Sequence, residues 1–345
     1  MTDPDPVLRD ALETLLRGDH LDTATARAVM DRIMEGVATP AQIGGILVAL
    51  RARGETVDEL TGMVMSMREH AVHVDLGVDA IDTCGTGGDR SGTFNISTAA
   101  ALVVAGAGVP VAKHGNRAAS SRCGSADVLE ALGVAISLPP AGVRRCVEEA
   151  GIGFMLAPTY HPAMRHAAAT RRELGIRTAF NILGPLANPA RVRRQALGVG
   201  DARLGEIMAG VLHQLGHHRA IVVTGAGGVD ELTLDGVAHC QRVDVDGVSA
   251  FDVDPRDLGF DPAPMTALQG GDAADNAARV RSILAGRPGA DRDVVVLNAA
   301  AALLAAERAA DLDAGVALAR ESIDSGAAAD RLDTLVRVST AAAAA

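Results

Sequence analysis

The densest group of residues that could do chemistry runs from Asp82 to Thr98. A short apolar run ends there in a turn with three glycines, Gly85, Gly87 and Gly88, before an alanine-rich segment. Glycines let backbone N–H groups close on anionic oxygens, and a helix N-terminus adds further N–H groups and its dipole. The pattern predicts a phosphate site, with an ordinary glycine turn before a capped helix as the alternative. Its side-chain donors would be Thr93, Asn95, Ser97 and Thr98.

The glycine spacing also limits the ligand. It matches neither the Walker A loop nor the GxGxxG fingerprint of dinucleotide-binding folds. ATP and NAD are therefore poor fits, and a smaller phosphorylated molecule is favoured.

A second candidate loop, Lys113–Ser121, follows the apolar run Val109–Ala112. Lys113 is the only lysine in a chain that otherwise uses arginine. This choice indicates a site that needs a compact point charge beside phosphate instead of a planar guanidinium fork. Chance is the alternative for Lys113. His114 fits a structural histidine bonded to the backbone as well as it fits a catalytic one.

Two neighbouring carboxylates, Asp230 and Glu231, follow the apolar run Ala220–Thr224 and a glycine-rich turn. Mg²⁺ takes few protein ligands and completes its shell with water and substrate phosphate. Alone, such a pair is usually solvated surface, and exposed loop acids rarely support a fold. Beside two candidate phosphate loops, the pair predicts a magnesium site.

Arginines gather in the segment His161–Pro189, which fits no simple periodicity beyond a helix expected over Pro162–Leu174. An arginine there could bind a carboxylate with two parallel hydrogen bonds, although any single arginine is more often solvent-exposed. The arginines of this cluster are Arg165, Arg171, Arg172 and Arg177.

The elements that must position these residues fall into two parts. Residues 1–72 indicate helices only, with capping boxes at Thr39 and Thr56 ahead of apolar residues at helical spacing. From about Val78, short apolar runs alternate with glycine turns and alanine-rich helices, which indicates an α/β fold with a mostly parallel central sheet. The expected strands are 80–83, 109–112, 134–137, 220–224 and 294–297.

The predicted domains are therefore a small helical domain at 1–72 and a larger α/β domain at 73–345. Part of 161–190 is expected to cross back to the helical domain and to bring its residues to the cleft between the two.

Bulk composition narrows the function. Hydrophobic residues make up 48% of the 345-residue chain, ample for a sizeable core, although aromatics are only 2%. A net charge of −11 opposes nucleic-acid binding, which needs a basic face. No signal-peptide pattern or membrane-length apolar run is present, so the protein is expected to be cytoplasmic.

Taken together, these stretches resemble the anthranilate phosphoribosyltransferase family over nearly the whole chain. The resemblance is carried by blocks in the family's order and spacing, with Cys123 where serine is expected. The blocks are Gly85–Asp89, Asn95–Thr98, Lys113–Arg117, Gly124–Glu130, Asn181–Leu186 and Asp230-Glu231.

The resemblance implies transfer of the phosphoribosyl group of phosphoribosyl pyrophosphate (PRPP) to the amine of anthranilate in tryptophan biosynthesis. It also implies Mg²⁺ as cofactor and a homodimer formed through the helical domain. By the same likeness Ser97, Asp230 and Glu231 hold the metal, while Gly85, Asn116 and Arg171 contact anthranilate. No general base is assigned. The residues implied for PRPP are Gly85, Gly88, Asp89, Thr93, Asn95, Ile96, Ser97, Thr98, Lys113, His114, Gly115, Asn116, Arg117, Ala118, Ala119, Ser120, Ser121 and Ser125.

Two other functions compete with this one. A pyrimidine nucleoside phosphorylase resembles the family in fold and carries a related lysine-bearing loop, but it needs no pair of metal-binding acids. A catalytically silent binding protein on the same fold, for nucleic acid, is opposed by the acidic net charge. The Asn181–Leu186 block and Asp230-Glu231 favour the transferase.

Overall fold

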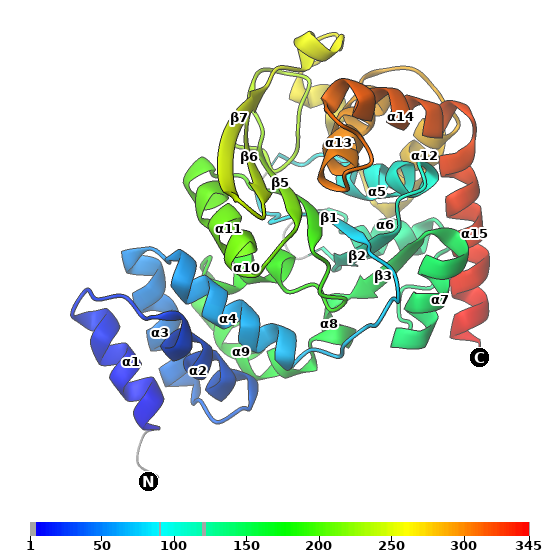
Figure 1. Cartoon of the computed structure of the whole chain (residues 1–345). Helices are drawn as coiled ribbons and strands as arrows, with labels where there is room; N and C mark the ends of the chain where they lie inside the picture. Colours follow the sequence, from blue (N-terminus) through cyan, green and yellow to red (C-terminus); the bar gives the residue numbers. More distant parts are fainter. Residues whose placement is uncertain (1–4, 90, 119–121, 345) are drawn as a thin grey trace.

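The computed structural model describes residues 5–89, 91–118 and 122–344. A helical bundle at one end of the molecule adjoins a larger part built on a seven-stranded sheet (Figure 1). The bundle helices are α1 (Pro6–Leu16), α2 (Thr23–Met34), α3 (Pro40–Arg53) and α4 (Val57–Glu69). Both predicted capping boxes form, at Thr39 with Gln42 and at Thr56 with Glu59.

The sheet has the order β3-β2-β1-β4-β5-β6-β7, with parallel pairing from β3 to β5 and antiparallel pairing beyond it. This confirms the expected fold class. The carboxyl ends of the parallel strands therefore meet at one edge, as ligand-binding α/β folds require. The strands are β1 (Ile81–Gly85), β2 (Val111–Gly115), β3 (Ile152–Leu156), β4 (Arg194–Gly198), β5 (Arg219–Thr224), β6 (Ala238–Asp244) and β7 (Gly247–Val253).

The remaining elements connect and cover these strands. The α-helices are α5 (Ile96–Gly106), α6 (Ser125–Ala131), α7 (Pro140–Ala150), α8 (Ala157–Tyr160), α9 (Arg165–Leu174), α10 (Phe180–Leu183), α11 (Ala202–Gln214), α12 (Ala273–Leu284), α13 (Ala290–Ala305), α14 (Leu312–Asp324) and α15 (Ala327–Ala343). The 3₁₀ turns are η1 (Pro162–Met164), η2 (Gly184–Leu186), η3 (Pro255–Leu258) and η4 (Met265–Leu268). Within the described residues, no helix has the length and apolar character needed to cross a membrane.

Two expected strands are wrong. Residues 294–297 lie in α13, because their apolar run continues to Ala305 and a fully buried helix shows no polar face. Residues 134–137 alternate between buried and more exposed positions, as a strand would, but they belong to no strand among the described residues. The backbone N–H of Ala135 instead donates to Ser339 Oγ on α15 at 3.1 Å.

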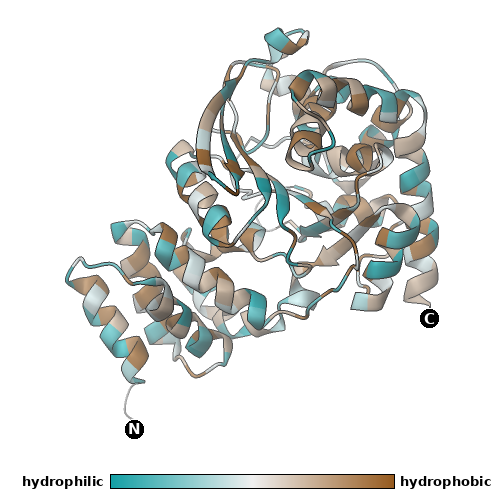
Figure 2. Cartoon of the chain, in the orientation of Figure 1, coloured by the Kyte–Doolittle hydropathy of each residue, from teal (hydrophilic) through white to brown (hydrophobic). Residues whose placement is uncertain are grey.

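The two faces of the sheet pack into two different cores. On β5, Ile221 and Val223 join the core that includes α5 and α13, while Ala220 and Val222 join the core of the helical bundle. Successive strand residues point to opposite faces, so one strand serves both cores. Figure 2 shows apolar residues along these strands and on the inward sides of the helices. The bundle is thus held by one face of the sheet through α4 and α11, which pack together.

The segment 161–190 extends from the α/β part to the bundle. Its helix α9 packs against α2 and α3, and α10 packs against α4. The same segment is anchored to the sheet by Asn188, whose buried amide donates to Asp82 Oδ2 at 2.8 Å and to the carbonyl of Ala112 at 2.9 Å. One chain segment therefore connects the bundle to the middle of the sheet.

We predict that Asn188→Ala destabilises the fold by about 2–3 kcal/mol, because it leaves a buried carboxylate with fewer donors. Burial raises the pKa of Asp82 to about 6, above its unfolded value, so stability from this group is present at low pH and lost as pH rises through 6. Without Asn188 that pKa should rise further. Urea unfolding at pH 5 and pH 8 should therefore show the larger loss at pH 8.

The control for this prediction is the pair Asp82→Asn and Asp82→Asn/Asn188→Ala. With no ionisable group at position 82, the effect of Asn188→Ala should be the same at both pH values. A pH-independent loss in the presence of Asp82 would contradict the prediction.

Candidate active site

The turn after β1 brings its backbone unusually close to the end of β5. A Cβ atom added to Gly85 would lie 2.6 Å from Asp230 Oδ2, and one added to Gly198 would lie 1.6 Å from the Asp230 carbonyl oxygen. Gly87 and Gly88 have φ angles of 65° and 70°, which favour glycine. The glycines are thus required by a close contact between two strand ends.

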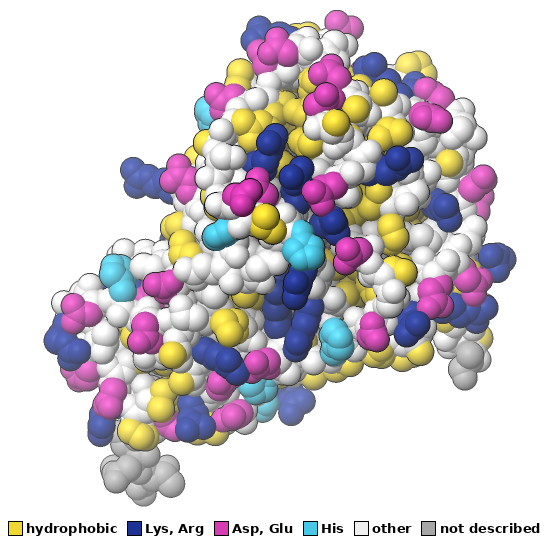
Figure 3. All heavy atoms as spheres, viewed as in Figure 1, with side chains coloured by type: hydrophobic (Ala, Val, Ile, Leu, Met, Phe, Trp, Pro, Cys, Tyr) yellow, Lys and Arg dark blue, Asp and Glu magenta, His cyan; other side chains and the backbone are white. Residues whose placement is uncertain are grey.

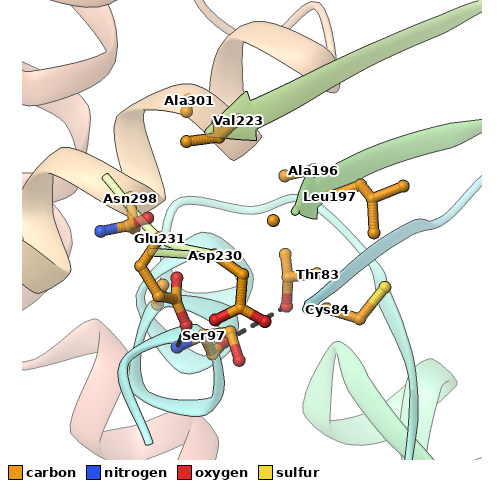
Figure 4. Close-up of a pocket in the computed structure, with 12 residues that line it drawn as sticks. Thr83, Cys84, Ser97, Ala196, Leu197, Val223, Asp230, Glu231, Asn298 and Ala301 are labelled. Atoms are coloured by element: carbon orange, nitrogen blue, oxygen red, sulfur yellow. Dashed lines mark hydrogen bonds between the residues drawn. The ribbon is translucent and has the colours of Figure 1, made fainter. Parts of the chain in front are cut away.

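Three acidic residues lie at this contact, and Figure 4 shows two of them, Asp230 and Glu231. Asp230 Oδ2 accepts the N–H of Gly87 at 2.6 Å, and Asp89 Oδ2 accepts the N–H of Asp230 at 3.3 Å. Glu231 Oε1 accepts the N–H of Ser97, in the first turn of α5, at 3.2 Å. The predicted metal residues Ser97, Asp230 and Glu231 therefore lie together.

This concentration of negative charge is electrostatically unfavourable by itself. Burial, and then repulsion from Asp230, raises the pKa of Glu231 to about 8. Burial and the charge of Asp89 raise the pKa of Asp230. Asp230 is only 8% exposed, so the expectation of exposed, solvated loop acids is wrong. A divalent cation would offset both the cost of burying these carboxylates and the repulsion that adds to it.

The donor set fits Mg²⁺, which prefers carboxylate and hydroxyl oxygens and keeps several waters. Among the described residues, no three His, Cys, Asp or Glu side chains form a cluster that could hold a metal. The site is therefore an open one, in which water and substrate oxygens would complete the shell. A cavity of about 20 Å³ lies beside the acids, lined by Thr83, Ser97, Gly198, Glu231 and Asn298 among others (Figure 4).

Lys113 lies beneath the glycine turn. It is 2% exposed, and its ammonium group donates to the carbonyl of Thr83 on β1. Burial lowers the pKa of Lys113, while the carboxylates of Asp82 and Glu231 oppose that shift. In this arrangement the lysine balances buried carboxylates. A direct contact with a phosphate stays a prediction.

His114, the next residue on β2, packs against His161 with 5.1 Å between ring centroids. Burial lowers the pKa of His114 to about 3 and that of His161 to about 4. Both imidazoles are therefore neutral at pH 7. Each Nε2 is buried without a hydrogen-bond partner in the described part of the chain.

The loop after β2 is held by its own hydrogen bonds. The carbonyl of Asn116 accepts from Ser125 Oγ at 3.3 Å, and a Cβ at Gly115 would lie 2.2 Å from the same hydroxyl. Arg117 forms ion pairs with Asp127 and Glu130 at 3.0 and 2.8 Å. Ala118 donates its N–H to Asp127 at 2.9 Å. The predicted residues Ala119, Ser120 and Ser121 lie outside the described residues.

The start of α5 and the turn before it place the remaining predicted residues. Asn95 Nδ2 donates to the carbonyl of Cys123 at 3.2 Å, which ties the first loop to the second. Ile96 and Thr98 are buried, and Thr93 Oγ1 lies 3.3 Å from Ser91 Oγ. The side chains of Ile96 and Thr98 are thus part of the core, and only their backbone groups suit a ligand.

Two arginines of the 161–190 segment are positioned for ligands. The guanidinium of Arg171 stacks over Phe180 at 5.1 Å, is half-buried, and forms no ion pair with a carboxylate of the described residues. Arg177 Nη2 donates to the carbonyl of Gly87 at 3.5 Å. Arg172 is exposed. The segment therefore contacts the glycine turn through Arg177 and carries, in Arg171, a half-buried cation without a carboxylate partner among the described residues.

Sequence reasoning gave no specific role to several residues that support this site. Asn188 anchors Asp82, His161 packs on His114, and Asn298 joins α13 to the acid pair through the N–H of Leu232 at 3.0 Å. Each lies far along the chain from its partner, in a stretch with no distinctive spacing. Arg177 was recognised only as one of a cluster.

Comparison with known proteins identifies this arrangement. Residues 9–71 match the helical bundle domain of a glycosyl transferase family, and residues 77–329 match its a/b domain. An anthranilate phosphoribosyltransferase from Roseiflexus castenholzii is 55% identical over 342 residues, covering 96% of this chain and 98% of that protein. The chain belongs to the anthranilate phosphoribosyltransferase family.

Solved structures of the family agree with the fold. The anthranilate phosphoribosyltransferase of Thermus thermophilus superimposes with a TM-score of 0.91 at 45% identity, covering 96% of this chain and 99% of that chain. The enzyme from Saccharomyces cerevisiae in complex with PRPP and Mg gives a TM-score of 0.90 at 25% identity, covering 98% and 99%. A mostly helical part and an α/β part are thus shared across the family.

We predict that Asp230→Asn/Glu231→Gln abolishes measurable Mg²⁺ binding by the protein with PRPP present, because amide oxygens carry no net charge to offset dehydration of the ion. Unlike the loss of exposed acids, the change should also alter stability without metal. It should raise the melting temperature, since the cost of burying two carboxylates and the repulsion between acids, which together raise both pKa values, disappear. Calorimetric Mg²⁺ titration and thermal unfolding check the two parts.

The matched control is Asp235→Asn, an exposed acid on the same connection. It should leave Mg²⁺ binding and melting temperature unchanged. Retained metal binding in the double variant would rule out the acid pair as the metal ligands.

We also predict that Lys113→Arg lowers stability by about 1–3 kcal/mol, the usual range for overpacking a core position. The planar guanidinium is wider than the ammonium and cannot keep the same contact with the Thr83 carbonyl without moving β1. Urea unfolding measures the loss. Wild-type stability in this variant would show that the buried slot accepts either cation.

Proposed function

We propose that the protein transfers the phosphoribosyl group of PRPP to the amine of anthranilate, giving N-(5-phosphoribosyl)anthranilate and pyrophosphate in tryptophan biosynthesis. One observation carries the proposal. The glycine turn after β1 meets the acid pair in the connection after β5, and segment 161–190 reaches the same turn through the contact of Arg177 with Gly87. The glycine turn suits the phosphates of PRPP, the acid pair suits the Mg²⁺ bound with them, and Arg171 suits the carboxylate of anthranilate.

PRPP is proposed to bind along the two loops. Its candidate contacts are the backbone of Gly85, Gly88 and Asp89, the Asn95–Thr98 turn, and the Lys113–Ser121 loop with Ser125. Neutral His114 adds no positive charge there, and Arg117 is already engaged by two acids. We therefore assign more of the phosphate binding to backbone N–H groups than to cationic side chains.

Mg²⁺, held by Ser97, Asp230 and Glu231, would supply positive charge to stabilise the departing pyrophosphate. The protein's own part in the reaction is positioning. Anthranilate's amine is neutral at pH 7, so its lone pair can attack the ribose carbon without a general base. Holding both reactants in one water-poor cleft supplies the rate enhancement.

Anthranilate is proposed to lie between Gly85, Asn116 and Arg171, with its carboxylate facing Arg171. Desolvation of that carboxylate is costly unless a cation meets it. Arg171 suits this task because its stacking on Phe180 fixes the position of the guanidinium. Burial also lowers the pKa of Arg171, and a bound anion would raise that pKa again.

The assembly and location are part of the same proposal. We treat 1–72, joined by part of 161–190, as a helical domain and 73–345 as the α/β domain; the packing of α9 on α2 and α3 supports this division. A homodimer through the helical domain fits the exposed apolar side chains of Leu16, Val37 and Val48. A cytoplasmic location fits a biosynthetic enzyme that uses PRPP.

The test of function is direct. Protein, PRPP, anthranilate and Mg²⁺ are incubated together, and the loss of anthranilate fluorescence is followed. Omission of PRPP or of Mg²⁺ should abolish the loss. Phosphate-dependent cleavage of a pyrimidine nucleoside, with no use of anthranilate, would replace the transferase by a phosphorylase.

Arg171→Ala should raise the KM for anthranilate much more than the KM for PRPP. A charge-assisted hydrogen bond contributes about 1.5–3 kcal/mol, so the increase should be roughly ten- to over a hundred-fold. Arg172→Ala is the matched control, since the next helical residue points about 100° away. Equal effects of the two substitutions on the KM for anthranilate would show that Arg171 does not bind its carboxylate.

A further inference from the structure

Five basic side chains gather at the amino ends of β4 and β5, at the edge of the sheet opposite the acid pair. Arg191 Nη2 donates to the carbonyl of Arg68 at 3.2 Å, and Arg193 Nη1 lies 3.3 Å from His218 Nε2. His217 completes the group, which we call the basic cluster. Figure 3 shows several basic and histidine side chains near the middle of the visible face, with acidic side chains among them.

The arginines of the basic cluster lack counter-charges among the described residues, although the carboxylate of Glu307 interacts with His218. Arg68, Arg191 and Arg193 form no ion pair with any carboxylate in the part of the chain that the structure describes. The adjacent Arg194, by contrast, pairs with Asp79 and Glu307 at 2.8 Å each. In a chain of net charge −11, acids are plentiful enough to neutralise these arginines, yet none does.

Repulsion within the cluster is visible in its ionisation. Burial, and then the charges of Arg191 and Arg193, lowers the pKa of Arg68 to about 10. Burial, and then the charge of Arg68, lowers the pKa of His217 to about 3. His217 is 2% exposed, and its Nε2 is buried without a hydrogen-bond partner among the described residues. His217 Nδ1 donates to the Leu212 carbonyl at 3.0 Å, so the buried Nε2 of this neutral ring is a hydrogen-bond acceptor, and binding of an oxyanion falls to the arginine guanidinium groups.

The backbone at this point is also held in an unusual conformation. Arg191 has a φ of 51°, in the left-handed region that side chains other than glycine seldom adopt. Such strain persists where the surrounding structure enforces it, and it is found at ligand-binding positions more often than elsewhere. The conformation places the guanidinium of Arg191 beside the end of α4.

We propose that the basic cluster binds a small oxyanion of the phosphate class at a site separate from the active site. Arginine guanidinium groups match such an anion in charge and in paired N–H geometry. The cluster and the acid pair lie at opposite ends of β5. Five residue steps at about 3.3 Å separate these ends by roughly 17 Å, so one small ligand cannot reach both.

The bound anion would join the two parts of the molecule. Arg68 belongs to α4 of the helical bundle, Arg191 and Arg193 precede β4, and the two histidines precede β5. A ligand that contacts all three segments binds the folded protein and not the unfolded chain, so it stabilises the fold by mass action. It would also fix α4 relative to the sheet, and hence the bundle that carries α9 and Arg171.

The test observes the cluster itself, so it does not depend on catalysis. In the protein labelled with ¹³C-histidine, the ring resonance of His218 is assigned by its absence in His218→Gln. It is then followed during titration with sodium phosphate, with sodium chloride of equal ionic strength as control. We expect a saturable shift with phosphate and none with chloride. A parallel titration with pyrophosphate shows whether the cluster prefers one phosphate group or two.

The double variant Arg191→Gln/Arg193→Gln should weaken phosphate binding at the His218 resonance by at least about tenfold. The control Arg203→Gln/Arg287→Gln removes the same charge from two exposed arginines with no ion pair among the described residues, and it should bind as the wild type does. If the double variant fails to fold, the single variant Arg193→Gln, at an exposed position, is measured instead.

Three results would overturn the proposal: a shift that does not saturate, the same shift with chloride, or undiminished binding in the arginine variants. Each would show general screening of surface charge in place of a site. The transferase assay, run on the same variants with anthranilate and PRPP, reports separately on the proposed function.

Discussion

The rest of this structure depends on carboxylates that are buried in and beside the parallel sheet. Their negative charge must be offset by a few neighbouring groups. Asp230 and Glu231 lie at the carboxyl edge of the sheet and Asp82 lies further back on β1, and burial raises the pKa of each one. A single buried ammonium, that of Lys113, faces them from β2. The remaining compensation comes from backbone N–H groups of the glycine turn and the start of α5, which fixes where those two segments lie.

This constraint explains why the glycines and the lysine are needed. A side chain at Gly85 or Gly198 would collide with Asp230, and the acids could then no longer approach the turn. A slot that holds an ammonium against a strand carbonyl leaves little room for a wider cation. The excess negative charge that remains, together with Ser97, suits Mg²⁺ and a substrate rich in phosphate.

The helical bundle contributes to the site because it shares a core with one face of the sheet. Alternating residues of β5 serve two cores, so displacement of the bundle would also disturb the strand that ends at the acid pair. Segment 161–190 then extends between bundle and sheet, held by Asn188 at one end and by α9 at the other. Arg177 thereby contacts the glycine turn from a different part of the chain. The acid pair lies at the carboxyl edge of the strands, and the basic cluster lies at the amino edge.

The sequence by itself determined the N-terminal helical region, the α/β class and the family. It also located the two loops and the acid pair, because each of these features depends on local spacing. Capping boxes, glycine turns and strand-terminal acids are patterns within a dozen residues, and both predicted capping boxes formed. The strand predicted from local spacing at residues 294–297 was wrong, because a fully buried helix and a buried strand have the same continuous apolar pattern.

Only the tertiary structure decided which side chains are buried and which meet across the chain. The acid pair, expected on the surface, lies in a half-buried edge because β4 and α5 close over it. Asn188 reaches Asp82, and Arg191 reaches Arg68, across more than a hundred residues. Such contacts depend on strand order and on the packing of the bundle against the sheet. The ionisation of Asp82, Lys113, Glu231 and His217 follows from that burial and from those neighbours, which no local pattern contains.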